Sequence, residues 1–135
     1  MNQIKEINIK IIPHDEQRYD TTGDYWIDKG GILQIRVSNF EDNRHALLVA
    51  LHELVEVFLT ENNGVLETDI YNFDIDFEKK RITGNIDEPG DDPKAPYKVE
   101  HCIATGIERI ICAILKCDWK PYEDACNKDR GSICS

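Results

Sequence analysis

A short apolar segment near the middle of the chain holds three ionisable groups close together. Residues 46–59 read ALLVALHELVEVFL, and the three that are not apolar are His52, Glu53 and Glu56. An α-helix turns by about 100° per residue, so His52 and Glu56 lie one turn apart on the same face. Because most of the remaining circumference is apolar, we expect a largely buried helix, in which an unpaired charge costs several kcal/mol. Something must compensate these charges, and a bound cation is one candidate.

The spacing of the three residues is that of a metal-binding motif. In zinc peptidases with the motif H-E-x-x-H, residues i and i+4 bind the ion and the intervening Glu activates its water. The segment HELVE therefore offers His52 and Glu56 as ligands and Glu53 as the catalytic base. A carboxylate binds Zn²⁺ at about 2.0–2.2 Å, but its charge makes the ion a poorer Lewis acid and widens the choice to Mn²⁺ or Fe²⁺. A solvent-exposed polar edge or a hydrogen-bonded pair is the alternative interpretation.

A further ligand has to come from another segment, and residues 97–109, YKVEHCIATGIER, offer Glu100 and His101. On a helical wheel, Glu100 shares an arc with isoleucines, where a buried carboxylate requires a cation. His101 lies on the more polar side, beside Glu108. Imidazole is the commoner ligand of transition metals, so we expect His101 first and Glu100 second. A polar first turn that only caps the helix remains the alternative.

The other histidines and acidic residues have weaker claims. His45 lies about 10 Å from His52 along the helix axis, too far to share an ion, and is expected on the surface of the first turn. His14 is expected in a loop. Asp74 is expected on a solvated strand face, or else as a partner that orients a ligating histidine.

The whole chain has 135 residues and a formal net charge of −10, which predicts a single domain over residues 1–135 and argues against nucleic acid as a partner. Neither a signal peptide nor an apolar run of about 18 residues, as a membrane span requires, is recognisable. An odd number of cysteines without a C-x-x-C pair favours reduced thiols and a cytoplasmic location. Three of them have spacings that match no standard zinc module: Cys117, Cys126 and Cys134.

The predicted elements give an α+β fold. Alternating apolar residues indicate a strand over 4–12 and a strand pair over 25–38, and longer periodic segments indicate helices over 41–60 and 96–117. Residues 65–83 fit a strand by their alternation, with a short helix as the alternative, and the tail from residue 118 is expected to pack loosely. We therefore expect a small N-terminal antiparallel sheet packed on two main helices, with a core like that of zincin metallopeptidases.

Several blocks of the chain resemble a group of small uncharacterised proteins of phages and prophages. The resemblance runs over about residues 11–122 and includes IIPHDEQRYDTTGDYW, IRVS, HELVE, FDIDFE, EPGDDPKAPYKVEH and ATGIER. It implies a protein that is encoded by a mobile element and acts in the bacterial cytoplasm, and it implies no particular activity. The likeness to zincins covers only the passage from the strand pair into the HELVE helix.

Three functions are compatible with these patterns. The first is a metal-dependent hydrolase with Zn²⁺ or another divalent transition metal, which acts on a peptide or another amide, and a short extended substrate along an edge strand fits a chain of this size. The second is a non-catalytic module that binds a host or phage protein, with a structural metal or none. The third is a Mg²⁺-dependent nucleotide pyrophosphohydrolase, suggested by the E-x-x-E spacing of Glu53 and Glu56. The oligomeric state is open.

Overall fold

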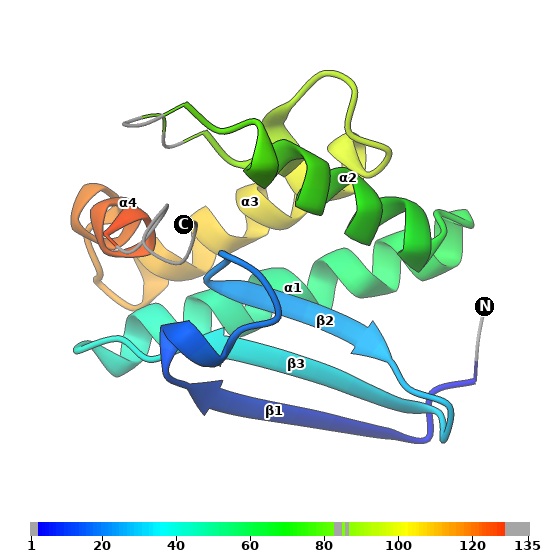
Figure 1. Cartoon of the computed structure of the whole chain (residues 1–135). Coiled ribbons are helices and arrows are strands. Elements are labelled where there is room, and N and C mark those ends of the chain that lie inside the picture. Colours follow the sequence, from blue (N-terminus) through cyan, green and yellow to red (C-terminus); the bar gives the residue numbers. More distant parts are fainter. Residues whose placement is uncertain (1–2, 83–84, 86, 129–135) are drawn as a thin grey trace.

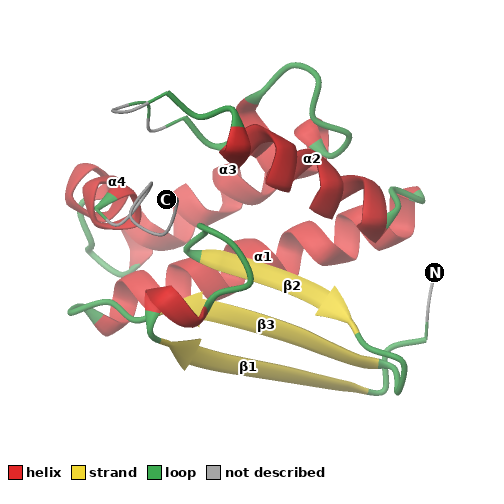
Figure 2. Ribbon diagram, viewed as in Figure 1, coloured by secondary structure: helices red, strands yellow, loops and turns green. Residues whose placement is uncertain are grey.

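A computed structural model describes residues 3–82, 85 and 87–128, and Figures 1 and 2 show their arrangement. The elements follow in the order β1 (Glu6–Ile12), η1 (His14–Glu16), β2 (Gly23–Ile27), β3 (Ile32–Ser38), α1 (Asn43–Asn63), α2 (Glu67–Lys79), η2 (Pro89–Asp91), α3 (Lys98–Ile114) and α4 (Trp119–Asn127). The α+β class is confirmed.

The sheet has three strands in the order β1-β3-β2. β2 and β3 form an antiparallel hairpin whose turn ends at Gly31, with a φ of 82° that suits glycine. β1, however, runs parallel to β3. The prediction of an antiparallel sheet is therefore confirmed for β2 and β3 and was wrong for β1. Residues 13–22 connect β1 to β2 and leave the space of one strand between them. β3 then occupies this space, antiparallel to β2 and parallel to β1.

The core lies between the sheet and α1, which is behind β2 and β3 in Figure 1. Leu33, Ile35 and Val37 of β3 alternate with polar residues and are completely buried. The side chain of Asp42 caps the start of α1 by accepting a hydrogen bond from the amide of Arg44. The helix ends at Gly64, a left-handed residue with a φ of 74°.

Residues 67–79 form a helix, α2, so the helical alternative for the ambiguous segment is the correct one. The buried residues of α2 are Ile70, Asp74 and Glu78, which are four residues apart. Two of them are acidic, and the alternation of aromatic and acidic residues obscured this helical spacing. Asp74 is buried, so its assignment to a solvated strand face was wrong.

α3 packs against α1 and runs antiparallel to it. Asn63 at the end of α1 contacts Glu100 near the start of α3, and Arg44 at the start of α1 contacts the carbonyl of Lys116. The described part of the C-terminal tail, residues 118–128, does not pack loosely as predicted, because it forms α4 and buries Tyr122 against the core.

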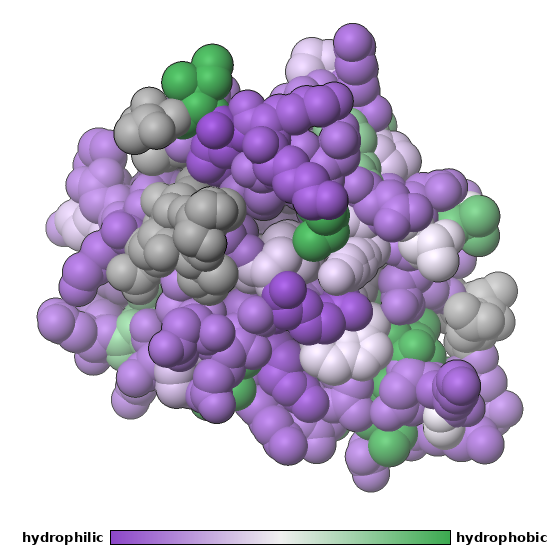
Figure 3. All heavy atoms as spheres, viewed as in Figure 1, coloured by the Kyte–Doolittle hydropathy of each residue, from purple (hydrophilic) through white to green (hydrophobic). Residues whose placement is uncertain are grey.

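None of the helices in the described part of the chain combines the length and apolar character needed to cross a bilayer. The side of the molecule in Figure 3 is mostly hydrophilic. Among residues 3–82, 85 and 87–128, no disulfide joins two cysteines; Cys134 lies outside the described residues.

Candidate metal centre

α1 and α3 bring three buried side chains together, and these are His52, Glu56 and His101. The Nε2 atom of His52 lies 3.0 Å from Oε2 of Glu56 and 3.2 Å from Nδ1 of His101, and the latter two atoms are 3.1 Å apart. The three atoms form a nearly equilateral triangle. Ligands about 2.0–2.1 Å from a tetrahedral zinc ion are about 3.3 Å from one another, so the triangle has nearly the size of one face of that tetrahedron.

A chain of contacts on the side away from the triangle fixes the orientation of the His52 imidazole. Its Nδ1 atom lies 2.7 Å from Oε1 of Glu108, and the second oxygen of Glu108 accepts a hydrogen bond from the hydroxyl of Tyr122. An ionised carboxylate can only accept, so a His52 that gave the lone pair of Nε2 to a cation would keep its proton on Nδ1, where Glu108 accepts it. Carboxylates commonly orient metal-binding histidines in this way.

His101 is held by the loop that contains η2. Its Nε2 atom lies 3.1 Å from Oε2 of Glu88 and 3.3 Å from Oδ1 of Asp91, within ion-pair distance but not aligned for a hydrogen bond. Gly90 packs so closely on the imidazole that a Cβ atom at this position would overlap the ring. His101 therefore offers Nδ1 to the triangle, and its other nitrogen faces two carboxylates.

Glu53 lies in the same pocket as the triangle and is half-buried. Its carboxylate is packed against Gly23 of β2, where a Cβ atom would overlap it. Burial, followed by the neighbouring carboxylate of Glu56, raises the pKa of Glu53 well above its usual range. A carboxylate with a raised pKa can accept a proton at a pH near neutral, which is what a general base requires.

The charges of the three clustered residues stabilise one another. Burial by itself would raise the pKa of Glu56, but hydrogen bonds from His101 and His52 outweigh it and lower that pKa. Burial would lower the pKa of His52, but Glu108 and Glu56 raise it well above the usual value. For His101, contacts with Asp91, Glu56 and Glu88 also outweigh burial and raise the pKa to about 12. Without a cation, protons on the two imidazoles provide the positive charge.

A second polar group lines the same pocket, and the sequence did not predict it. Asp74 of α2 accepts hydrogen bonds from the hydroxyls of Tyr19, at 2.8 Å, and Tyr97, at 2.5 Å. Burial raises the pKa of Asp74 to about 7, although the bonds from Tyr97 and Tyr19 act in the opposite direction. In the described part of the chain, no hydrogen bond joins Asp74 to His52 or His101, so it is not the orienting partner considered above.

At the side of this pocket, Arg18 forms an ion pair with Asp24 at 2.6 Å and lies over the rings of Trp26 and Tyr71. The pocket therefore combines the cluster of His52, Glu56 and His101 with a cation that stacks on aromatic rings. Its polar groups come from the loop before β2, from β2, from α1 to α4, and from the loop that contains η2.

The structure does not bring Glu100, the second choice for the further ligand, into the cluster. Its side chain is buried, but Oε2 accepts a hydrogen bond from Asn63 at 2.8 Å. His14 also lies elsewhere, in η1, where its two nitrogens contact Ser38 and Asp20. Of the two residues offered by the first turn of α3, the geometry favours His101.

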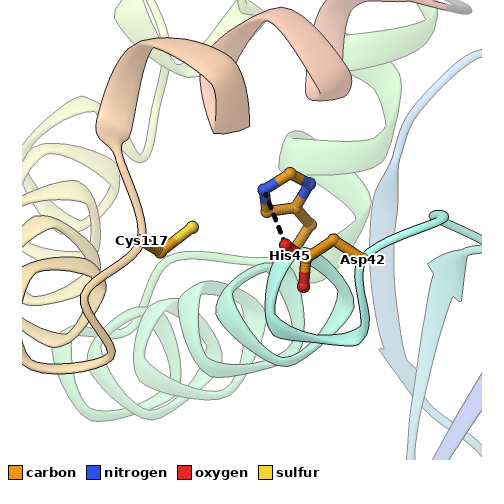
Figure 4. Close-up of side chains that lie close together, drawn as sticks. All are labelled: Asp42, His45 and Cys117. Atoms are coloured by element: carbon orange, nitrogen blue, oxygen red, sulfur yellow. Dashed lines mark ion pairs between the residues drawn. The ribbon is translucent and has the colours of Figure 1, made fainter.

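His45 belongs to a different group, with Asp42 and Cys117 (Figure 4). It is partly buried and packs against Tyr122, so its expected place on the surface was wrong. Nε2 of His45 lies 3.8 Å from Asp42, but both oxygens of Asp42 contact Arg44. A cation here would have to displace the arginine, so this group is a poor metal site.

Glu88, Asp91 and Glu108 are functional candidates that the motif search missed. A signal for Glu108 was present, because it lies seven residues after His101 and hence on the same side of α3. Glu88 and Asp91 lie in a loop, where no periodicity marks an inward direction. Comparison of the chain with models of protein families, with curated proteins and with solved structures finds no match.

Proposed function

We propose that the protein is a metal-dependent hydrolase whose ion is held by His52, Glu56 and His101. One observation carries the proposal: three donor atoms from two helices lie 3.0–3.2 Å apart in a buried site. Two imidazoles and a carboxylate suit a transition metal, of which zinc is the common choice. Mg²⁺ prefers oxygen ligands, so the two nitrogens argue against the pyrophosphohydrolase alternative.

The donor set also accounts for the departure of HELVE from the motif H-E-x-x-H. Catalytic zinc sites with two histidines and one glutamate leave the fourth position for water. Here Glu56 stands where the motif H-E-x-x-H has its second histidine, and His101 supplies that imidazole from α3. The number of charges around the ion is therefore the same as in a His₂Glu site, although the carboxylate and the imidazole have exchanged places.

Each residue then has a defined task in hydrolysis. When bound, the ion would lower the pKa of a coordinated water and polarise a carbonyl group. Glu53, one position after His52, accepts the proton of the attacking water and passes it to the leaving group. Glu108 holds His52 in the tautomer that ligates through Nε2. Glu88 and Asp91 contact the remaining nitrogen of His101.

The position of β2 supports an extended substrate. β2 is an edge strand of the sheet, and Gly23, Asp24 and Tyr25 line the pocket that contains the cluster. An extended peptide can add to the edge of a sheet through main-chain hydrogen bonds. A peptide along β2 would pass beside Glu53, which packs against Gly23.

Metal analysis of protein purified without chelator or a nickel column tests the proposal. We expect about one transition metal ion per chain, its loss in His101→Ala, and its retention in Glu53→Gln. Glu100→Gln is the matched control, because Glu100 is buried on the same helix but bonded to Asn63. Wild-type protein should cleave members of a fluorogenic peptide library, and Glu53→Gln should not.

The outcomes separate the candidate functions. Metal that is retained without turnover on any peptide or amide would support the binding module with a structural ion. Wild-type protein that neither contains metal nor takes up added Zn²⁺ would exclude the proposed hydrolase.

A further inference from the structure

α3 turns its apolar side outward, which is the reverse of an ordinary surface helix. Its buried residues include Glu100, His101 and Glu108. The opposite side of the helix carries five large aliphatic side chains that are 36–67% exposed: Val99, Ile103, Ile107, Ile110 and Ile114. Gly106 lies among them, and a Cβ atom there would meet no atom within 4 Å. This stripe lacks a partner in the described part of the chain.

β1 also has an exposed apolar side, and no helix of the described chain covers it. Ile7, Ile9 and Ile11 are 45–54% exposed. They pair in register with Leu33, Ile35 and Val37 of β3, which are completely buried, so both sets point to the same side of the sheet. α1 packs on that side against β2 and β3. β1 extends beyond the cover that α1 provides.

α1 lies between these two surfaces, because it packs against α3 and against β3, the neighbour of β1. Leu47 and Phe58 are 63% and 47% exposed. On a helix with about 100° per residue, both point more than about 110° away from His52, and thus away from the metal cluster. We name the combined surface the apolar face, and its members are Ile7, Ile9, Ile11, Leu47, Phe58, Val99, Ile103, Ile107, Ile110 and Ile114.

We propose that the apolar face joins two copies of this chain, with α3 of each copy on β1 of the other. The exposed apolar side of α3 has no sheet to pack on, and the exposed apolar side of β1 has no helix that covers it. In the dimer each would cover the other. Their lengths also match: the seven residues of β1 span about 23 Å, and the 17 residues of α3 span about 25 Å. A twofold axis forms both contacts at once, as an isologous interface requires.

The size and charge of the apolar face fit a second copy. Ten large side chains that are about half exposed provide on the order of 800 Å² per chain, which is what a standard interface buries, and more than the largest apolar patch of a typical monomer. The chain has a net charge of −10, but α3 turns both of its acidic residues inward. Two copies can therefore meet at α3 without bringing its carboxylates together.

Sedimentation velocity of the full chain tests this interface. We expect wild-type protein at micromolar concentration to sediment as a dimer. Ile110→Glu in α3 and Ile9→Lys in β1 should each raise the dissociation constant by roughly 30-fold or more, as loss of a central contact does. Leu66→Glu is the matched control, since Leu66 is 61% exposed at the start of α2, outside the apolar face. Circular dichroism checks that each variant is folded.

The double variant Ile9→Lys/Ile110→Glu tests the proposed pairing directly. If α3 lies on β1 of the partner, each new lysine meets a new glutamate, and the double variant should dimerise more tightly than either single variant. Wild-type protein that stays monomeric at all accessible concentrations would overturn the proposal. A dimer that survives both single substitutions, or a double variant as weak as the singles, would also overturn it.

Discussion

Glu108 connects the candidate metal centre to the C-terminal part of the molecule. One oxygen contacts Nδ1 of His52 at 2.7 Å, and the other accepts from the hydroxyl of Tyr122 in α4. Removal of its charge leaves the ligands in place but weakens the fixed orientation and the basicity of His52. Glu108 would therefore affect the binding of the proposed ion without touching it.

Glu108→Gln should lower zinc affinity about 10–100-fold, as loss of such partners usually does. Competition with a chromophoric chelator measures this affinity. Glu100→Gln is a control with similar burial on the same helix, and its affinity should equal that of the wild type. Equal losses in both variants would show that a general weakening of α3, not the contact with His52, is responsible.

Asp74 gives the stability a distinct pH dependence. Its pKa rises from 3.8 to about 7 on folding, mainly through burial, so between these pH values the folded chain binds more protons than the unfolded chain. The free energy of unfolding therefore falls as the pH rises through this window, by about 4 kcal/mol in total.

Asp74→Asn removes this titration, so the melting temperature of the wild type should fall relative to that of the variant between about pH 4 and pH 7. The control is Asp76→Asn, because Asp76 is exposed on the same helix and pairs with Lys80. Thermal melts in a series of buffers measure the difference. Parallel curves for the wild type and Asp74→Asn would contradict the assignment.

At the scale of elements, the loop with η2 determines the position of His101. Gly90→Ala would place a methyl group where the imidazole ring lies, so the ring or the loop must move. We expect zinc affinity to fall by an amount comparable to that of Glu108→Gln, about 10–100-fold. Gly30→Ala is the control, since Gly30 lies in an exposed turn where a Cβ atom comes no closer than 3.4 Å to its neighbours. Unchanged affinity in Gly90→Ala would mean that the loop adapts freely.

The sequence predicted the strands and α1 from the spacing of their apolar residues, although Ile7, Ile9 and Ile11 of β1 stay 45–54% exposed. Periodicity also predicted the helix α3 but not which of its faces is buried, because its inward residues include Glu100 and Glu108. It left α2 undecided, because Asp74 is one of the buried residues of that helix. The helical spacing of His52 and Glu56 could be recognised because both residues lie within one element. The choice between Glu100 and His101 needed the packing of α3 on α1, which no local pattern contains. The direction of β1 depended in the same way on the path of residues 13–22.

At the scale of the whole molecule, the proposed ion ties α1 to α3 and should stabilise the fold. Free metal at about 1,000 times its dissociation constant adds about 4 kcal/mol, or roughly 10–20 °C in melting temperature for a chain of this size. Calorimetry with and without chelator measures this gain. His101→Ala should show no difference between the two conditions, and a wild type that chelator leaves unchanged would contradict a metal centre.

The gain should also depend on pH. The pKa of His52 is raised and that of His101 is raised to about 12, so both imidazoles carry protons at neutral pH when no metal is bound. A metal ion must displace these protons, and its affinity therefore rises with pH. Titration calorimetry in buffers of different ionisation enthalpy should detect proton release on zinc binding, and a signal independent of the buffer would contradict it.

The two-sided character of α3 restricts how its sequence can vary over evolution. Inward positions such as His101 and Glu108 surround the cluster, and outward positions such as Ile103 and Ile110 form the apolar face. Because inward and outward positions both occur in almost every turn of this 17-residue helix, few sites remain where a random substitution is neutral. We expect a saturation library of the chain to tolerate fewer replacements in α3 than in α4, although both helices lie at the surface.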